Sequence, residues 1–126
     1  MTRILRAVAL VLSLTSAAAA QAAAVQFDPA QLQETMARLN LTEAQKQAVR
    51  PILEAGIRER LQILQAAGFE RGKKPSLPQL LQVRGPLRES RARTEAQLSD
   101  ILGRAQMQEL RTIAEERRRK MRQRFR

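Results

Sequence analysis

The sequence of 126 residues predicts an all-α protein with four helices, arranged as a bent helical hairpin with a short N-terminal helix and a basic C-terminal helix. Two observations support this prediction. Ala, Leu, Gln, Glu and Arg dominate the composition, whereas β-branched residues are sparse and aromatic residues make up only 2%. Residues that favour helix starts also stand directly before stretches in which apolar residues recur at helical spacing.

The first helix is expected over residues 28–39, because Asp28 can cap a helix and Pro29 suits the first helical position. The second is expected over residues 42–67, because Gly68 follows, and glycine is the residue most often found just beyond a helix end. A glycine- and proline-containing turn then separates the second helix from the third.

A capping box marks the start of the second helix. The Thr42 hydroxyl can accept a hydrogen bond from the Gln45 amide, and the Gln45 side chain can reach back to the Thr42 amide. Pro51 lies inside this helix, where it removes one backbone hydrogen bond, so we expect a bend near residues 47–51. The apolar side of the helix comprises Val49, Ile52, Leu53, Ile57, Leu61, Ile63 and Leu64.

Ser76 is the expected cap of the third helix, which has Pro78 in its first turn and continues to about Leu102. Gly85-Pro86 interrupts it much as Pro51 interrupts its neighbour, and the sequence leaves open whether these prolines bend or break their helices. Two interleaved heptad series predict the packing stripe: Leu80, Leu87, Thr94 and Ile101, and Leu77, Arg84, Arg91 and Leu98.

The fourth helix is expected from about Arg104 toward the C-terminus, with one apolar stripe. Its last turns are strongly basic, which weakens them as a helix. The stripe comprises Leu110, Ile113, Ala114, Met121 and Phe125.

The N-terminus is typical of a cleavable export signal. Arg3 and Arg6 are followed by an apolar run at residues 7–14, too short to span a bilayer, and by small residues that suit cleavage within Ala18–Ala24. We therefore expect residues 1–22 to be removed and the protein to reach the periplasm. The sequence contains no cysteine, which excludes both a lipid-anchored N-terminus and a disulfide framework.

Residues 23–126 are expected to form a single helical domain, small enough that dimerisation is a natural way to bury more apolar surface. The formal charge of +11 falls to +9 without Arg3 and Arg6, and the tail, residues 117–126, holds seven basic residues and no acid. Such a tail is either a solvated helical extension or a docking segment for acidic proteins or for an anionic membrane surface.

The chain contains an internal repeat at an offset of 61 residues. Residues 41–54 and 102–115 share seven of fourteen positions. With its leucine before the cap and its export signal, the chain resembles the Spy/CpxP family and its LTxxQ motif. The second copy departs from that motif at Gly103, which stands where threonine is usual and offers no side-chain cap. The motif residues are Leu41, Thr42 and Gln45, then Leu102 and Gln106.

This resemblance implies a curved, cradle-like antiparallel homodimer whose concave face binds unfolded or partly folded envelope proteins and limits their aggregation without ATP. The CpxP branch of the family implies an alternative, a regulator that docks on the periplasmic domain of an envelope-stress sensor kinase. Both functions would use a basic, partly apolar helical face, so the sequence leaves the choice between chaperone and regulator open.

Other classes of function find little support. The sequence has no histidine or cysteine, and none of its few serines has a base beside it, so we expect neither an enzyme nor a bound cofactor. Metal binding is not expected either, because it needs imidazole, thiolate or clustered oxygen ligands, and the sequence offers only scattered methionines and carboxylates. Nucleic-acid binding is not expected despite a pI near 11.7, because tryptophan and tyrosine are absent and the charge is concentrated in the tail.

Several arginines lie on otherwise apolar helix faces. Arginine can lay its aliphatic stem along apolar neighbours and keep its guanidinium in water, so such a face offers both apolar area and positive charge. One interpretation is that these arginines only rim a hairpin or dimer interface; the other is that they belong to a surface for unfolded clients. The candidate client-binding residues are Arg60, Leu61, Arg84, Leu87, Arg88 and Arg91.

Overall fold

The computed structural model describes residues 25–124, in which four helices form: α2 (Pro29–Arg38), α3 (Glu43–Ala66), α4 (Leu77–Ser99) and α5 (Arg104–Arg124). This range contains no β-strand, which confirms the predicted all-α class and the four helices. None of the described helices is long and apolar enough to cross a bilayer. The predicted export segment, residues 1–22, and Phe125 lie outside the described residues.

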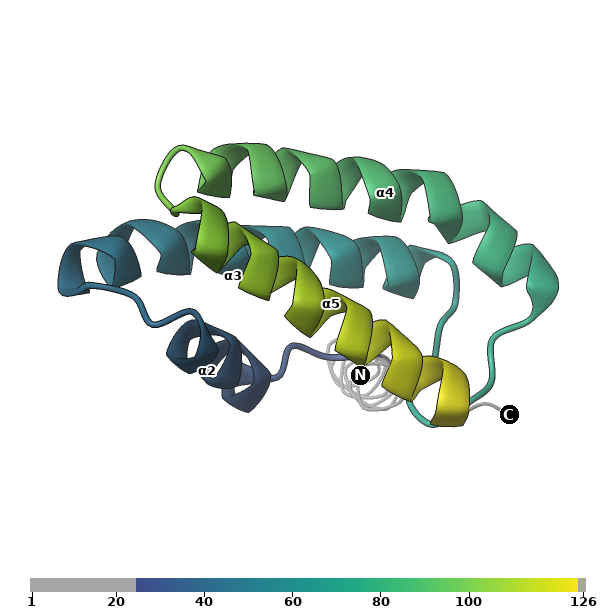
Figure 1. Ribbon diagram of the computed structural model, residues 1–126. Coiled ribbons are helices and arrows are strands. Elements are labelled where there is room, and N and C mark those ends of the chain that lie inside the picture. Colours follow the sequence, from purple (N-terminus) through teal and green to yellow (C-terminus); the bar gives the residue numbers. More distant parts are fainter. Residues whose placement is uncertain (1–24, 125–126) are drawn as a thin grey trace, which may run out of the picture.

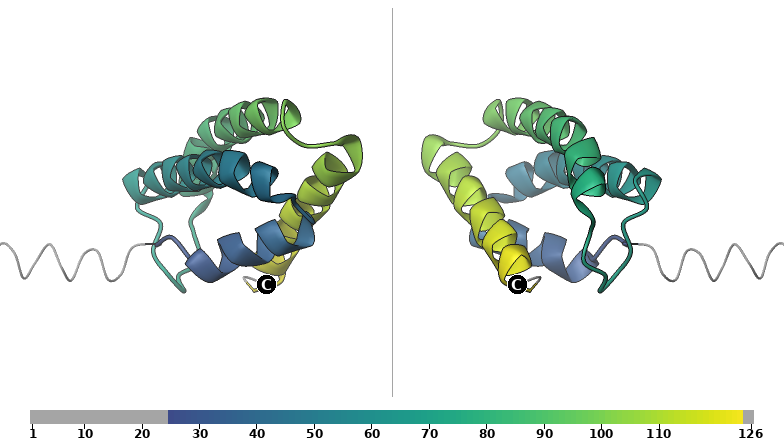
Figure 2. Two further views of the ribbon diagram at one scale, coloured as in Figure 1. Left: turned by 90° about the vertical axis from the view of Figure 1, so that its left-hand side faces the viewer. Right: turned by 90° about the vertical axis from the view of Figure 1, so that its right-hand side faces the viewer.

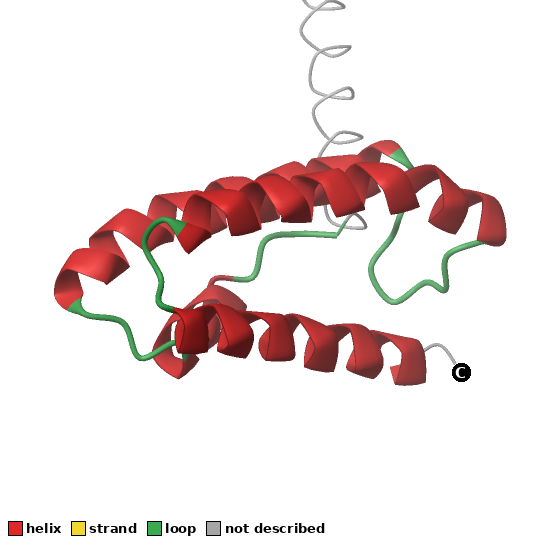
Figure 3. Ribbon diagram, turned by 45° about the horizontal axis from the view of Figure 1, so that its top comes forward, coloured by secondary structure: helices red, strands yellow, loops and turns green. Residues whose placement is uncertain are grey.

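The helices form two layers. Helices α3 and α4 lie side by side and antiparallel in one layer, and α2 and α5 lie beneath them (Figures 1 and 2). Helix α5 starts beside the end of α4 and then diverges from it along its length (Figures 1 and 3). The layers are therefore closest at one end, where α3 begins, α4 ends and α5 begins.

The starts of the first three helices are capped as predicted. Asp28 Oδ1 accepts a hydrogen bond from the Ala30 amide at 3.0 Å. Ser76 forms a complete capping box with Gln79: its Oγ accepts the Gln79 amide at 3.3 Å, and Gln79 Oε1 accepts the Ser76 amide at 2.8 Å. Thr42 caps α3 in the same way. These local interactions explain why short sequence patterns located the helix starts.

Neither internal proline breaks its helix: α3 is continuous through Pro51, and α4 is continuous through Gly85-Pro86. Both proline rings are solvent-exposed. A proline on the outer side of a helix removes its hydrogen bond where the freed carbonyl can bind water, so continuity is preserved.

The helix ends differ in one place from the prediction. Helix α3 ends as expected before Gly68, whose φ of +82° is the left-handed conformation that glycine adopts easily. Helix α4 ends at Ser99, earlier than the predicted Leu102. The Leu98 carbonyl accepts the amides of both Ile101 and Leu102, at 3.0 and 2.8 Å, so the chain closes a tight turn and leaves the helix axis.

The core lies at the end where the two layers meet. Leu39, Val49, Leu98 and Ile113 are almost completely buried and come from α3, α4, α5 and the end of α2. Around them the core comprises Leu32, Met36, Leu41, Leu53, Leu102 and Met107, with Phe27, Ile52, Ile57, Ile101 and Leu110 packed against it. Both leucines of the repeat, Leu41 and Leu102, therefore serve as core residues.

The predicted heptad stripe of α4 is only half correct. Leu98 is buried as expected, but Leu77 and Leu80 in the first turns are exposed. Val83 and Ser90, outside both heptad series, are buried instead. Because α5 diverges from α4, the first turns of α4 have only α3 beside them, and one neighbouring helix cannot cover the whole predicted stripe.

The two glutamines of the repeat form one hydrogen-bonded pair. Gln45 Nε2 donates to Gln106 Oε1, and Gln106 Nε2 donates to Gln45 Oε1, both at 3.0 Å. Each glutamine also bonds the chain just before the other's helix: Gln45 Nε2 donates to the Ile101 carbonyl at 3.3 Å, and Gln106 Nε2 to the Asn40 carbonyl at 3.5 Å. We call this network the glutamine clasp.

Each glutamine in the clasp also caps its own helix. Gln45 Oε1 accepts the Thr42 amide at 3.0 Å, and Gln106 Oε1 accepts the Gly103 amide at 2.9 Å. Gly103 lacks the threonine hydroxyl, yet α5 begins at the next residue, because the glutamine half of the box is retained. The two copies of the sequence repeat thus make equivalent hydrogen bonds.

We expect Gln106→Ala to lower the free energy of unfolding by about 1–3 kcal/mol, because it leaves Gln45 and three backbone groups, the Gly103 amide and the Leu39 and Asn40 carbonyls, without this partner. Urea unfolding followed by circular dichroism measures the change. Gln108→Ala is the matched control, since Gln108 is exposed and its side chain makes no hydrogen bond within residues 25–124; it should change stability by less than about 0.5 kcal/mol. Equal losses in the two variants would contradict the role of the clasp.

Gly56 allows α3 and α4 to approach closely. A Cβ atom at this position would lie 2.5 Å from Thr94 Oγ1 and 3.3 Å from Thr94 Cγ2, closer than packed atoms tolerate. Thr94 is buried and β-branched, so its side chain has little room to move. The absence of a side chain at Gly56 therefore sets the spacing of the upper layer.

Gly56→Ala should destabilise the protein by about 1–3 kcal/mol through overpacking, although alanine is the better helix former. Gly85→Ala provides the comparison on the facing helix, because nothing lies within 4 Å of a Cβ added there. This second change should be neutral or stabilising by up to about 1 kcal/mol. Chemical denaturation of both variants tests the difference in sign, and a stabilising Gly56→Ala would refute the close approach.

Candidate functional site

The six candidate client-binding residues lie on the facing halves of α3 and α4, away from the main core. Arg84 and Arg88 are exposed, whereas the other four are half-buried. The residues are Arg60 and Leu61 on α3, and Arg84, Leu87, Arg88 and Arg91 on α4. The sequence pattern thus identified positions on two adjacent helices.

Arg60 lies against α4. Its Nη1 donates to Thr94 Oγ1 at 3.3 Å, and an added Cβ on Gly56 would lie 3.1 Å from the same nitrogen. The space that Gly56 leaves is therefore shared by the Thr94 side chain and the Arg60 guanidinium. Burial lowers the pKa of Arg60, and the positive charge of Arg91 lowers it further.

Arg91 is half-buried without a compensating acid. Within residues 25–124, its guanidinium makes no hydrogen bond and no ion pair, whereas Arg93 on the same helix pairs with Glu59. Burial is the main reason that the pKa of Arg91 is lowered, and the charges of Arg118 and Arg88 lower it further. The ion pair between Arg93 and Glu59 holds the pKa of Glu59 below its ordinary value.

Arg91 of α4 interacts electrostatically with arginines on three helices, and we call the four residues the arginine cluster: Arg60 of α3, Arg88 and Arg91 of α4, and Arg118 of α5. Sequence reasoning found the first three and missed Arg118. The reason is that Arg118 stands in an unbroken run of basic residues, so nothing in the pattern separates it from its neighbours.

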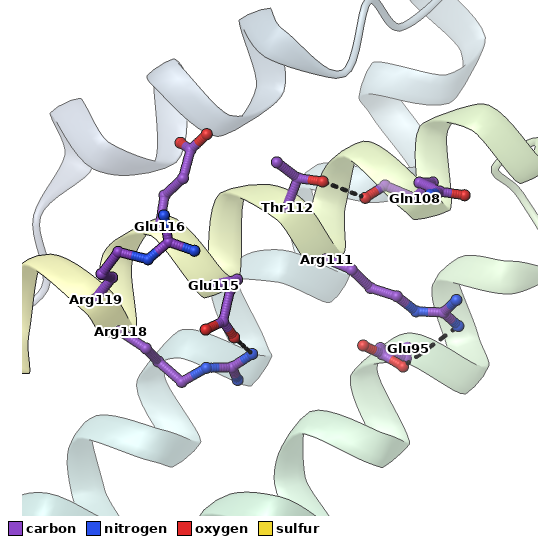
Figure 4. A pocket seen from close by; sticks show the side chains of 8 residues that line it. All are labelled: Glu95, Gln108, Arg111, Thr112, Glu115, Glu116, Arg118 and Arg119. Atoms are coloured by element: carbon purple, nitrogen blue, oxygen red, sulfur yellow. Dashed lines mark hydrogen bonds and ion pairs between the residues drawn. The ribbon is translucent and has the colours of Figure 1, made fainter.

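An open depression lies between α4 and α5, and one member of the cluster, Arg118, lines it. Figure 4 shows Arg111, Glu115 and Arg118 extending from α5 toward the α3–α4 layer. Arg111 pairs with Glu95 of α4 at 3.8 Å, and Glu115 pairs with Arg118 at 2.9 Å, which lowers the pKa of Glu115. The residues that line the depression are Glu95, Gln108, Arg111, Thr112, Glu115, Glu116, Arg118 and Arg119.

Large apolar side chains are exposed on the same half of the molecule. Leu77 and Leu81 in the first turns of α4 are 67% and 61% exposed, Leu80 is 46% exposed, and Met121 on α5 is 58% exposed. They were not among the candidate residues, although the heptad pattern contained Leu77 and Leu80. Exposed apolar groups near unpaired cations can bind polypeptide segments that are both apolar and acidic.

Polar contacts with α2 hold the middle of α5, between Glu109 and Arg117, in place. Arg38 pairs with Glu109 at 2.8 Å and with Glu116 at 2.6 Å. Arg117 donates to the Gln31 carbonyl at 3.0 Å and to Thr35 Oγ1 at 2.6 Å. Because Arg118 follows directly, these contacts position the α5 member of the arginine cluster.

The described residues contain no group of three or more acidic, histidine or cysteine side chains that could hold a metal ion. The side chains at the site offer positive charge, hydrogen-bond donors and exposed apolar area. Comparison with protein-family models, curated proteins and solved structures finds no match to this chain.

Replacing Arg38 with glutamine should lower the unfolding temperature by a few degrees near pH 7, and this difference should shrink as the pH falls below 4.5. Hydrogen bonding to Arg38 is the main reason that the pKa of Glu116 lies below its ordinary value of 4.5. The stabilisation is therefore present above that value and is lost as the pH falls through the lowered pKa. Thermal unfolding of both proteins across this pH range measures it.

Arg50→Gln is the control for this experiment, because Arg50 is exposed and makes no ion pair in the described part of the chain. It should leave the pH dependence of the unfolding temperature unchanged. A deficit in Arg38→Gln that persisted at low pH would show that Arg38 acts through packing of its stem rather than through its charge.

Proposed function

We propose that the mature protein is an ATP-independent chaperone that binds unfolded or partly folded proteins and limits their aggregation. The observation that supports this most directly is the combination of half-buried, unpaired Arg91 with the exposed leucines in the first turns of α4. Folded proteins usually bury their large apolar side chains and pair their half-buried charges. A surface that exposes the first and leaves the second unpaired therefore supports binding to another polypeptide.

The proposed binding has two components. Positive charge draws acidic segments of a client toward the arginine cluster, and this attraction increases the association rate without requiring a particular sequence. Apolar groups such as Leu77, Leu80 and Leu81 then hold the apolar parts of the same segments. Both components are weak and reversible, so release needs no nucleotide hydrolysis.

The cellular setting belongs to the same proposal. The export signal and the two LTxxQ-like segments support a periplasmic member of the Spy/CpxP family. The glutamine clasp gives the motif residues Gln45 and Gln106 a shared structural role, which supports reading the two segments as one motif pair. Dimerisation through a second copy of the chain would extend the binding surface.

A second function, docking on the acidic periplasmic domain of a stress-sensor kinase, is favoured by the end of α5. Arg119, Lys120 and Arg124 are exposed there and make no ion pair within residues 25–124. Removal of the whole tail, residues 117–126, would also delete Arg117 and Arg118, which serve α2 and the arginine cluster. Neutralising the three exposed residues alone therefore separates tail docking from client binding.

The double variant Arg84→Glu/Arg91→Glu should bind a denatured, acidic client about tenfold more weakly than the parent, which corresponds to about 1.4 kcal/mol. The measurements are suppression of client aggregation by light scattering at stoichiometric amounts and client affinity by fluorescence anisotropy. Helical content by circular dichroism should be unchanged.

Arg50→Glu/Arg104→Glu is the matched control, since it reverses two charges as well, at exposed positions at the core end of the molecule. It should retain most of the client affinity. If the parent protein itself fails to reduce aggregation, the chaperone proposal is wrong; if both double variants lose affinity equally, net charge rather than this surface governs binding.

A further inference from the structure

We propose that the end of the molecule opposite the core docks on an anionic lipid bilayer. Two stretches form this end, residues 71–88 and residues 117–124, and we call them together the basic end. The proposal does not depend on client capture. It also extends the charge argument beyond the C-terminal tail, because a second stretch, far from the tail in the sequence, takes part.

Charge is strongly segregated along the chain. Residues 71–88 and 117–126 hold twelve of the 23 basic residues and none of the twelve acidic residues. The rest of the mature chain, residues 23–70 and 89–116, holds nine basic residues and all twelve acidic ones, which gives it a formal charge of −3. The net positive charge of the mature protein therefore comes entirely from these two stretches.

The fold brings the two stretches to the same end of the molecule. Helix α4 starts and helix α5 ends on the right-hand side of Figure 1, where the connection between α3 and α4 also lies, and the right-hand view of Figure 2 looks onto this end. The base of that connection is closed by Gln79, whose Nε2 donates to the Ala67 carbonyl at 3.1 Å. Charges that are distant in the sequence thus act on one side of the protein.

Most basic side chains of this end have no acidic partner. Lys73 pairs with Glu70 at 3.3 Å, and Arg122 pairs with Glu115 at 3.3 Å. Clustered lysines and arginines of this kind are attracted to an anionic lipid surface, and their contributions add. The residues of the basic end that are exposed and make no ion pair within residues 25–124 are Arg71, Lys74, Arg84, Arg88, Arg119, Lys120 and Arg124.

Exposed apolar side chains lie in the same two stretches. The large hydrophobic residues that remain exposed within residues 25–124 are Leu77, Leu80, Leu81 and Met121, and all four belong to the basic end. The spacing of the three leucines places them on one side of the first turns of α4. A bilayer interface offers both environments together, headgroup phosphates for the cations and acyl chains for the leucines.

A bilayer fits this arrangement better than an acidic protein domain does. An acidic domain would attract the cations, but it would need a matching apolar patch to cover the leucines. A bilayer surface is continuous and its acyl region is fluid, so side chains on the connection, on α4 and on α5 can all reach it. Because the rest of the mature chain is net negative, the same field orients the protein with its basic end toward the lipid.

Sedimentation of the mature protein, residues 23–126, with phosphatidylcholine vesicles that contain phosphatidylglycerol tests the proposal. The parent should bind these vesicles and not vesicles of phosphatidylcholine alone, and added salt should weaken the binding. Lys74→Gln/Lys120→Gln removes one cation from each stretch and should weaken binding about tenfold. Arg50→Gln/Arg104→Gln removes two charges at exposed positions at the core end and should bind like the parent.

Leu77→Gln/Leu81→Gln tests the apolar part of the contact. It should weaken vesicle binding about tenfold, because the leucines no longer enter the acyl region. Helical content by circular dichroism should be unchanged, since both side chains are exposed in the folded protein.

A single tryptophan reports insertion directly, because the sequence contains none. The emission of Leu81→Trp should shift to shorter wavelengths when phosphatidylglycerol vesicles are added. The matched control is Gln108→Trp, at an exposed position of α5 near the core end, and its emission should not shift.

Failure of the parent to bind phosphatidylglycerol vesicles overturns the proposal, and so does equal weakening by the two charge variants. Full binding by Leu77→Gln/Leu81→Gln, or an unshifted emission of Leu81→Trp, also overturns it and leaves charge-driven docking on an acidic protein as the use of the basic end. No denatured client is present in these measurements, so their outcome is independent of the chaperone proposal.

Discussion

The glutamine clasp is the interaction on which the remaining structure depends. Two side chains, Gln45 and Gln106, bond each other, the amides of the residues directly before their own helices, and the carbonyls of the opposite connecting segments. All four amide hydrogen-bonding functions are used in a part-buried setting, where an unsatisfied group would be costly. The clasp therefore determines where α3 and α5 begin, and the buried leucines Leu41 and Leu102 place the core beside it.

With the layers joined at that end, the opposite end is free to diverge. Helix α5 diverges from α4, and polar contacts of Arg38 with Glu109 and Glu116 and of Arg117 with Gln31 and Thr35 hold its middle to α2. The two ends of the molecule therefore differ. Apolar packing dominates one end, and the other end exposes leucines, unpaired arginines and an open depression. The candidate site lies at the end of the molecule that the apolar core does not reach.

Much of the fold could be predicted because its determinants are local. Capping by Asp28, Thr42 and Ser76 depends on residues at most a turn away, so the helix starts follow from short patterns. The clasp could not be predicted, although both glutamines were identified, because their pairing joins residues far apart in the chain. Sequence analysis also missed Arg118 and expected the first turns of α4 to be packed. The position of Arg118 and the exposure of those turns both depend on the direction that α5 takes, which no short pattern determines. The role of Gly56 could not be predicted either, because it depends on Thr94 facing it from α4.

The equivalence of the two halves of the clasp has a topological consequence. The bonds made by Gln45 and by Gln106 correspond to each other across the repeat, and the connection between α3 and α4 is the covalent link between the two halves. The clasp and this connection lie at opposite ends of the α3–α4 layer (Figure 1). The two halves of the chain are therefore tied together at both ends, by side-chain hydrogen bonds at one end and by the backbone itself at the other.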